Sequence, residues 1–121
     1  MNTMLKNILI VDDNRDICEV VKIILSKAGY KTKAVEHFEP FNETEAPDMI
    51  LLDIKISDQD GREICHQLKH KKATSKIPVI IFSASPDIEK EAYKAGADDF
   101  ISKPFEIKEL LGKIHRLEQA A

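Results

Sequence analysis

Three short runs of this sequence are apolar at every position, and they constrain the fold more than any other feature. The runs are residues 8–11 (ILIV), 49–52 (MILL) and 79–82 (VIIF). A strand with one face in water alternates apolar and polar residues, whereas a strand covered on both faces does not. We therefore expect central strands of a parallel sheet. Residues 30–35 alternate lysines with other types and residues 99–102 are few, so we expect strands nearer the edges.

Helical patterns lie between these strands. Apolar residues recur at helical spacing over residues 17–25, and Gly29 is placed to end that helix. Residues 107–117 repeat the same spacing. Both segments are expected to be amphipathic helices that cover the sheet.

The remaining helices have weaker signals. Asp60 and Gly61 indicate a turn that opens a helix through about residue 71. Ser85 is expected to cap a helix over residues 86–95. The segment 36–46 contains Pro40, so a helix there would be reduced or irregular.

Strands and helices thus alternate with short connections, which favours right-handed crossovers and helices on both faces of one sheet. The sequence predicts a doubly wound α/β fold with a five-stranded parallel sheet. A chain of 121 residues is long enough for one core and too short for two ordinary domains. We expect a single domain over residues 1–121, with its core at about residues 6–118 and no output domain.

Composition excludes several classes of protein. The net charge of −3, with acids and bases interspersed, provides no basic field for nucleic acid, and no apolar run approaches the length that spans a bilayer. Residues 1–6 lack the features of a secretory signal, so a cytoplasmic location is expected. Cys18 and Cys65 have no paired spacing and are expected to be reduced packing residues. The four histidines show no metal-ligand or catalytic spacing and are expected on the surface.

Polar residues follow the apolar strands at the point where each strand ends. They are Asp12, Asp13, Asp53, Ser83 and Lys103. The carboxyl ends of parallel strands share one edge of the sheet, where ligands bind at the switch point of the strand order. These five side chains are therefore expected to converge.

Three converging carboxylates require a cation, since neighbouring unit charges about 4 Å apart repel by roughly 1–4 kcal/mol. Magnesium prefers oxygen ligands and keeps several waters, so one or two carboxylates and a backbone carbonyl suffice. A dication and Lys103 would balance the three acids. The resulting neutral pocket could accept a phosphate dianion.

Asp53 is the candidate nucleophile among these acids. It ends the most apolar central strand and precedes a predicted loop over residues 54–61, so we expect it to face solvent and attack phosphorus. Lys103 and the metal would neutralise the phosphoryl oxygens, and the Ser83 hydroxyl would donate a hydrogen bond to them.

The chain resembles the receiver domain of two-component response regulators over nearly its whole length. The shared motifs are residues 8–13 (ILIVDD), 51–53 (LLD), 60–61 (DG), 83–84 (SA) and 103–105 (KPF). The resemblance implies a chemotaxis-regulator-like fold with the flavodoxin-like strand order 2-1-3-4-5.

The resemblance also implies roles for individual residues. Asp53 would be the phosphoacceptor, and Lys103 would contact the phosphoryl group. Asp12, Asp13, Asp53 and the backbone carbonyl of Lys55 would hold Mg²⁺, with Mn²⁺ as an alternative. Ser83 and Phe100 would form the switch that alters the surface of the fourth helix, fifth strand and fifth helix. The bond before Pro104 would be cis.

Partners follow from the same resemblance. The phosphoryl donor would be a sensor histidine kinase or a histidine phosphotransfer protein, and a separate, unknown downstream protein would bind near Phe100. The protein would be a monomer or a weak, phosphorylation-dependent dimer, without direct contact to nucleic acid or membrane. Family members often have proline at the position of Ser57, which leaves the rigidity of that loop open.

The same residues allow other interpretations. Asp12 and Asp13 alone would be read as a helix cap, and only their combination with Asp53 and Lys103 favours a site. A phosphorylation-independent interaction module could use the same fold, although the intact acid set argues against it. A phosphohydrolase would need an acid two residues after Asp53, where Lys55 stands, so only slow self-dephosphorylation is expected.

Overall fold

The central sheet has five parallel strands in a computed structural model that describes residues 7–56 and 58–120. Its order is β2-β1-β3-β6-β7. β6 and β7 are the fourth and fifth strands of this sheet, because β4 and β5 pair separately, so the predicted order 2-1-3-4-5 is confirmed. The strands are β1 (Asn7–Val11), β2 (Lys31–Val35), β3 (Met49–Asp53), β6 (Val79–Ser83) and β7 (Asp99–Ser102). β3 and β6 are buried at every position, as their uninterrupted apolar runs predict.

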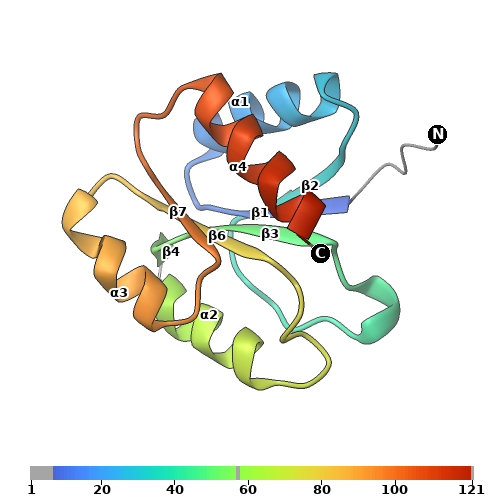
Figure 1. Cartoon of the computed structure of the whole chain (residues 1–121), viewed down its shortest axis with the longest axis vertical. Coiled ribbons are helices and arrows are strands. Elements are labelled where there is room, and N and C mark those ends of the chain that lie inside the picture. The colour runs from blue at the N-terminus through green and yellow to red at the C-terminus, as the bar shows by residue number, and fades with distance from the viewer. Residues whose placement is uncertain (1–6, 57, 121) are drawn as a thin grey trace.

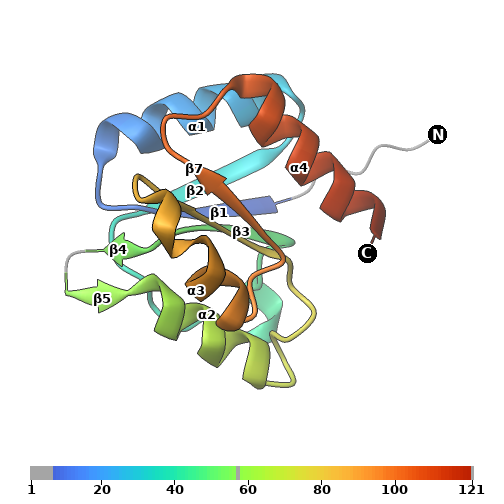
Figure 2. The ribbon, with the colours of Figure 1, turned by 60° about the vertical axis from the view of Figure 1, so that its left-hand side comes forward.

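Helices cover both faces of the sheet. On one face lie α1 (Arg15–Lys27) and α4 (Ile107–Ala120), and on the other lie α2 (Gly61–His70) and α3 (Glu89–Lys94), as Figures 1 and 2 show. Because successive strand residues point to opposite faces, each face has its own core. Ile8 and Ile10 pack with α1 and α4, whereas Val11 packs on the α2 side.

The ends of the helices follow local sequence signals. Gly29 follows α1 with a φ of 99°, a left-handed conformation that favours glycine. Asp60 caps α2 by accepting a hydrogen bond from the Arg62 N–H at 2.9 Å. Ser85 occupies the predicted N-cap position before Pro86, but its side chain makes no capping hydrogen bond. The segment begins as a 3₁₀ turn, η2 (Pro86–Ile88), before α3.

Two connections depart from a simple strand–helix alternation. Between β2 and β3 the only regular element is a 3₁₀ turn, η1 (Glu43–Glu45), in line with the irregular helix expected at 36–46. The stretch after β3, predicted as a loop, instead contains two short antiparallel strands, β4 (Lys55–Ile56) and β5 (Gln59–Asp60). Ser57 and the predicted core position 6 lie outside the described residues.

Other expectations concern single residues. Cys18 and Cys65 are buried free thiols, and all four histidines are exposed. Among the residues that the structure describes, no helix is both long and apolar enough to cross a membrane.

Candidate functional site

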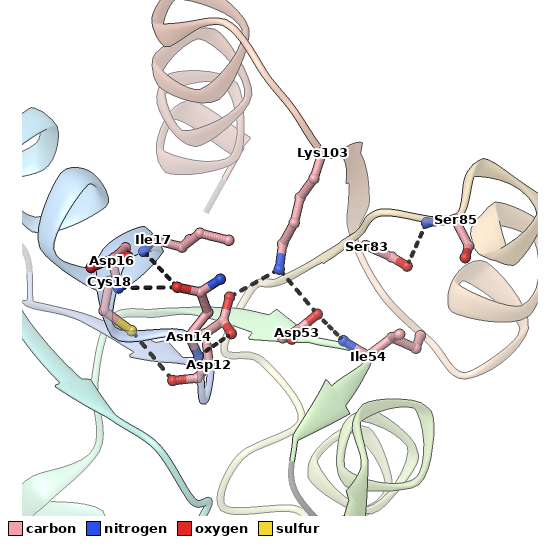
Figure 3. A network of polar contacts seen from close by, with 10 residues as sticks. All are labelled: Asp12, Asn14, Asp16, Ile17, Cys18, Asp53, Ile54, Ser83, Ser85 and Lys103. Atoms are coloured by element: carbon pink, nitrogen blue, oxygen red, sulfur yellow. Dashed lines mark hydrogen bonds and ion pairs between the residues drawn. The ribbon is translucent and has the colours of Figure 1, made fainter.

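Four charged side chains meet at the carboxyl edge of the sheet. Asp12, Asp13 and Asp53 each place a carboxylate oxygen within 4.8 Å of the others. The Lys103 Nζ lies 3.0 Å from Asp12 Oδ2 and 3.4 Å from Asp53 Oδ1, as Figure 3 shows. The structure thus brings together the acids and the lysine that the strand ends suggested.

Asp12 is fully buried directly after β1, and backbone hydrogen bonds fix its position. Its N–H donates to the Val35 carbonyl at 3.1 Å. Its Oδ1 accepts the Asn14 N–H at 2.9 Å. Asn14 in turn caps α1 by accepting the N–H groups of Asp16 and Ile17. Sequence reasoning did not single out Asn14, although an asparagine just before a helical pattern is a recognised capping signal.

Asp53 is the last residue of β3 and is only 7% exposed, less than sequence reasoning expects for a solvent-facing nucleophile. Its Oδ1 accepts the Ile54 N–H at 2.8 Å. Gly61 packs against the backbone of this segment, and its N–H donates to the Ile54 carbonyl at 2.7 Å. The Ile54 N–H thus holds the Asp53 carboxylate, and Gly61 holds the backbone that carries it.

The charges of this site do not cancel. Three carboxylates and one ammonium leave a formal charge of −2 when all are ionised. Burial, with the negative charge of Asp12, raises the pKa of Asp53 to about 6, although Lys103 acts in the opposite direction. The donors are carboxylate oxygens at close range, which is the ligand type that hard divalent cations prefer. The residues therefore fit such a cation.

Ser83 ends β6, and Lys103 directly follows the neighbouring strand β7. The buried Ser83 accepts the Ser85 N–H at its Oγ, 3.1 Å away, so its hydroxyl proton can still be donated. The Lys103 N–H donates to the Ser83 carbonyl at 2.8 Å. The bond between Lys103 and Pro104 is cis, as the resemblance implied.

Phe100 and Lys55 occupy different environments. The Phe100 ring is buried in the core on the α2 and α3 side. Lys55 is exposed in β4, two residues after Asp53. Neither side chain belongs to the acid cluster itself.

Sequence reasoning missed a second charged cluster, which lies at the start of β7, away from the carboxyl edge of the sheet. Buried Asp99 in β7 accepts hydrogen bonds from its neighbours at 2.8–3.1 Å: the Tyr93 hydroxyl, the Phe100 N–H, the Lys113 ammonium and the Arg116 guanidinium. This cluster ties α3 and α4 to the edge strand. The only sequence signal was the spacing of Lys113 and Arg116 on one side of the last helix.

Residues 8–115 match the response regulator receiver domain. The chain is 31% identical to the transcriptional regulatory protein GltR of Pseudomonas aeruginosa, an alignment that covers 96% of this chain and 50% of GltR. The chain spans about half the length of such relatives.

Solved structures give the same likeness. The response regulator DrrB of Thermotoga maritima, described as an OmpR/PhoB homologue, superposes with a TM-score of 0.84 at 32% identity, over 97% of this chain and 54% of DrrB. The receiver domain of the sensor histidine kinase PA1611 from Pseudomonas aeruginosa superposes with a TM-score of 0.79 at 23% identity, over 94% and 98% of the two chains. That domain has a magnesium ion coordinated in its active-site cleft.

Proposed function

The chain belongs to the response regulator receiver domain family, and on that premise we propose that Asp53 accepts a phosphoryl group from a phosphohistidine donor. The protein is a phosphoacceptor signalling switch, as the family is. The observation that carries the assignment to Asp53 is its place beside Asp12, Asp13 and Lys103 at the end of β3. The interaction module that works without phosphorylation is not favoured.

The transfer exchanges one bond to phosphorus for another. A carboxylate oxygen of Asp53 forms the new O–P bond as the P–N bond of the phosphohistidine breaks. The leaving imidazole departs neutral when its other ring nitrogen carries a proton. The Ile54 N–H holds the carboxylate in place. The Lys103 ammonium, which lies beside Asp12 and Asp53, neutralises negative charge on the phosphoryl oxygens during transfer. The Ser83 hydroxyl donates a hydrogen bond to one of those oxygens.

Asp12, Asp13, Asp53 and the Lys55 carbonyl would hold the metal. The magnesium ion in the PA1611 receiver domain supports the choice of Mg²⁺. When bound, Mg²⁺ supplies charge neutralisation for the carboxylates and the transferring phosphoryl group. Because burial and Asp12 raise the pKa of Asp53 to about 6, a nearby dication would favour the ionised carboxylate that attack requires.

The output would pass through Ser83 and Phe100 to the surface of α3, β7 and α4, which are the fourth helix, fifth strand and fifth helix of the sequence prediction. Phosphorylation adds roughly 1.5–2 negative charges and would bias two existing conformations of this surface. A sensor histidine kinase or a phosphotransfer protein would be the donor, and a downstream protein would bind there. We propose a cytoplasmic location and a monomer or weak dimer.

Incubation with acetyl phosphate and Mg²⁺, followed by peptide mass mapping, tests the proposal. We expect one phosphoryl group on Asp53, no labelling of Asp53→Asn, and loss of labelling when the divalent cation is chelated. Labelling of another residue at the same rate in Asp53→Asn would show that Asp53 is not the acceptor.

A further inference from the structure

One part of the sheet has no helix over it within residues 7–56 and 58–120. On the face covered by α2 and α3, the described segment that crosses the β1–β2 region is residues 36–48, whose regular structure is the single turn η1. Figures 1 and 2 show this extended connection beside the sheet. A cleft of about 450 Å³ lies between the connection and the two strands.

The floor of this cleft is apolar and incompletely covered. β1 is an interior strand, and Ile8 and Ile10 on its other face are at most 1% exposed. Leu9, which points to the cleft side, is only half-buried, as is Val35 on β2. Apolar residues of an interior strand are normally covered by a helix layer. The cleft therefore leaves apolar area for another element to cover.

One wall of the cleft is held in place. Phe38 and Phe41 pack edge to face, with ring centroids 6.0 Å apart. The Gln59 side chain accepts the Phe38 N–H at 2.8 Å and donates to the Phe38 carbonyl at 3.0 Å. A wall fixed by two hydrogen bonds needs little ordering when a partner binds, which favours affinity.

The charges around the cleft differ in sign between its two sides. Lys31 and Lys33 are exposed on β2, on the same face as Val35, because residues two apart share a face. The connection opposite carries the exposed Glu39 and Glu45. An occupant would match this pattern with acids along one flank, bases along the other and an apolar stripe between them.

We propose that this cleft binds one amphipathic α-helix of a partner protein, with its apolar stripe on Leu9, Val35 and Phe38 and its acidic flank toward Lys31 and Lys33. A helix is favoured over an added strand because the cleft lies on the face of the sheet, whereas a strand pairs along its edge. Exposed charges on both sides also differ from the mostly apolar lining of small-molecule pockets. This surface is separate from α3, β7 and α4, and its lining residues do not include the acids at the end of β3.

A phage-displayed library tests the proposal on the whole chain without a phosphodonor. Its peptides of about 18 residues, or five helical turns, carry fixed apolar residues at helical spacing and random flanks. We expect enrichment of acids on one flank. A selected peptide should shift the amide NMR signals of β1, β2 and residues 38–47.

Two double charge reversals serve as a matched pair. Lys31→Glu with Lys33→Glu should weaken peptide binding about tenfold or more. Lys90→Glu with Lys94→Glu, on the exposed side of α3, should leave the affinity unchanged. All four lysines are exposed, and equal melting temperatures would establish that both variants fold.

Several results would overturn the inference: no enrichment, shifts confined to α3 and α4, selected peptides that pair as strands with β2, or equal affinity for both double variants. Because these measurements use no phosphodonor, they stand apart from the labelling of Asp53. Failure of one leaves the other intact.

Discussion

Gly61→Ala should destabilise the protein and slow phosphorylation of Asp53, because the added methyl group has no room. A Cβ atom at Gly61 would collide with the carbonyl oxygen of Asp53 and lie 2.9 Å from the Cα of Ile54. Both are backbone atoms of the acceptor segment, so the chain itself must move. Overpacking of this kind costs about 1–3 kcal/mol.

Gly112→Ala provides the matched control. Gly112 lies within α4, and a Cβ atom there would meet no atom within 4 Å beyond its chain neighbours and the adjacent helix backbone. Alanine is favoured over glycine in a helix interior by about 1 kcal/mol, so this variant should gain stability. The same glycine-to-alanine change should therefore lower the free energy of unfolding at residue 61 and raise it at residue 112. The two variants should differ in stability by roughly 2–4 kcal/mol.

Urea unfolding measures the stabilities, provided that the three proteins have equal m-values. The rate of labelling with acetyl phosphate and Mg²⁺, measured on the folded protein, then reports on the acceptor geometry. We expect Gly112→Ala to label at the rate of the parent chain and Gly61→Ala to label more slowly. A Gly61→Ala variant as stable and as reactive as the parent would refute the close packing between Gly61 and Asp53.

Further predictions concern charged groups and thiols. Burial opposes ionisation of Asp99, but hydrogen bonds from the Phe100 N–H, Lys113 and Tyr93 lower its pKa overall. The ionised Asp99 therefore stabilises the protein above the unfolded pKa of about 3.9, and this stabilisation is lost as the pH falls through the lower folded pKa. Asp99→Asn should therefore cost about 1–3 kcal/mol at neutral pH, and a difference from the parent that stayed constant down to pH 2 would contradict this account. Lys103→Gln should raise the pKa of Asp53 above its value of about 6 in the absence of metal, since Lys103 lowers that pKa; carboxyl ¹³C NMR titration would detect it, and an unchanged pKa would exclude the interaction. Burial raises the pKa of Cys18 and of Cys65 to about 11, so both thiols should react with a disulfide reagent at pH 8 only as urea unfolds the chain, and rapid reaction of the native protein would contradict their burial.

The sheet could be predicted from the sequence because burial on both faces removes the polar positions from its central strands. The runs at residues 8–11, 49–52 and 79–82 became β1, β3 and β6 with shifts of one residue at most. The convergence of Asp12, Asp53 and Lys103 could be predicted for a related reason, since parallel strands end at one edge. These conclusions need only the period of the pattern and the direction of the strands.

The hairpin after Asp53 could not be predicted in this way. β4 and β5 have two residues each, too few for a periodic signal. The Gln59 side chain pairs with the Phe38 backbone, 21 positions away. The residues next to Gln59 and Phe38 form no motif that predicts this contact. The Asp99 cluster was missed because its partners come from three elements. Side-chain contacts of this kind depend on tertiary placement, which local pattern does not encode.

The same hairpin connects the acceptor with the cleft beside β2. Asp53 binds the Ile54 N–H, the Ile54 carbonyl accepts the Gly61 N–H, and Gln59 between them holds Phe38. A shift of the Asp53 backbone can therefore reach the cleft wall through these hydrogen bonds and the short stretch of backbone from Gly61 to Gln59. Gly61→Ala, which forces that shift, should change the affinity of the cleft for a selected helical peptide, while Gly112→Ala should not. Equal affinities in both variants would mean that the wall at Phe38 is independent of the acceptor segment.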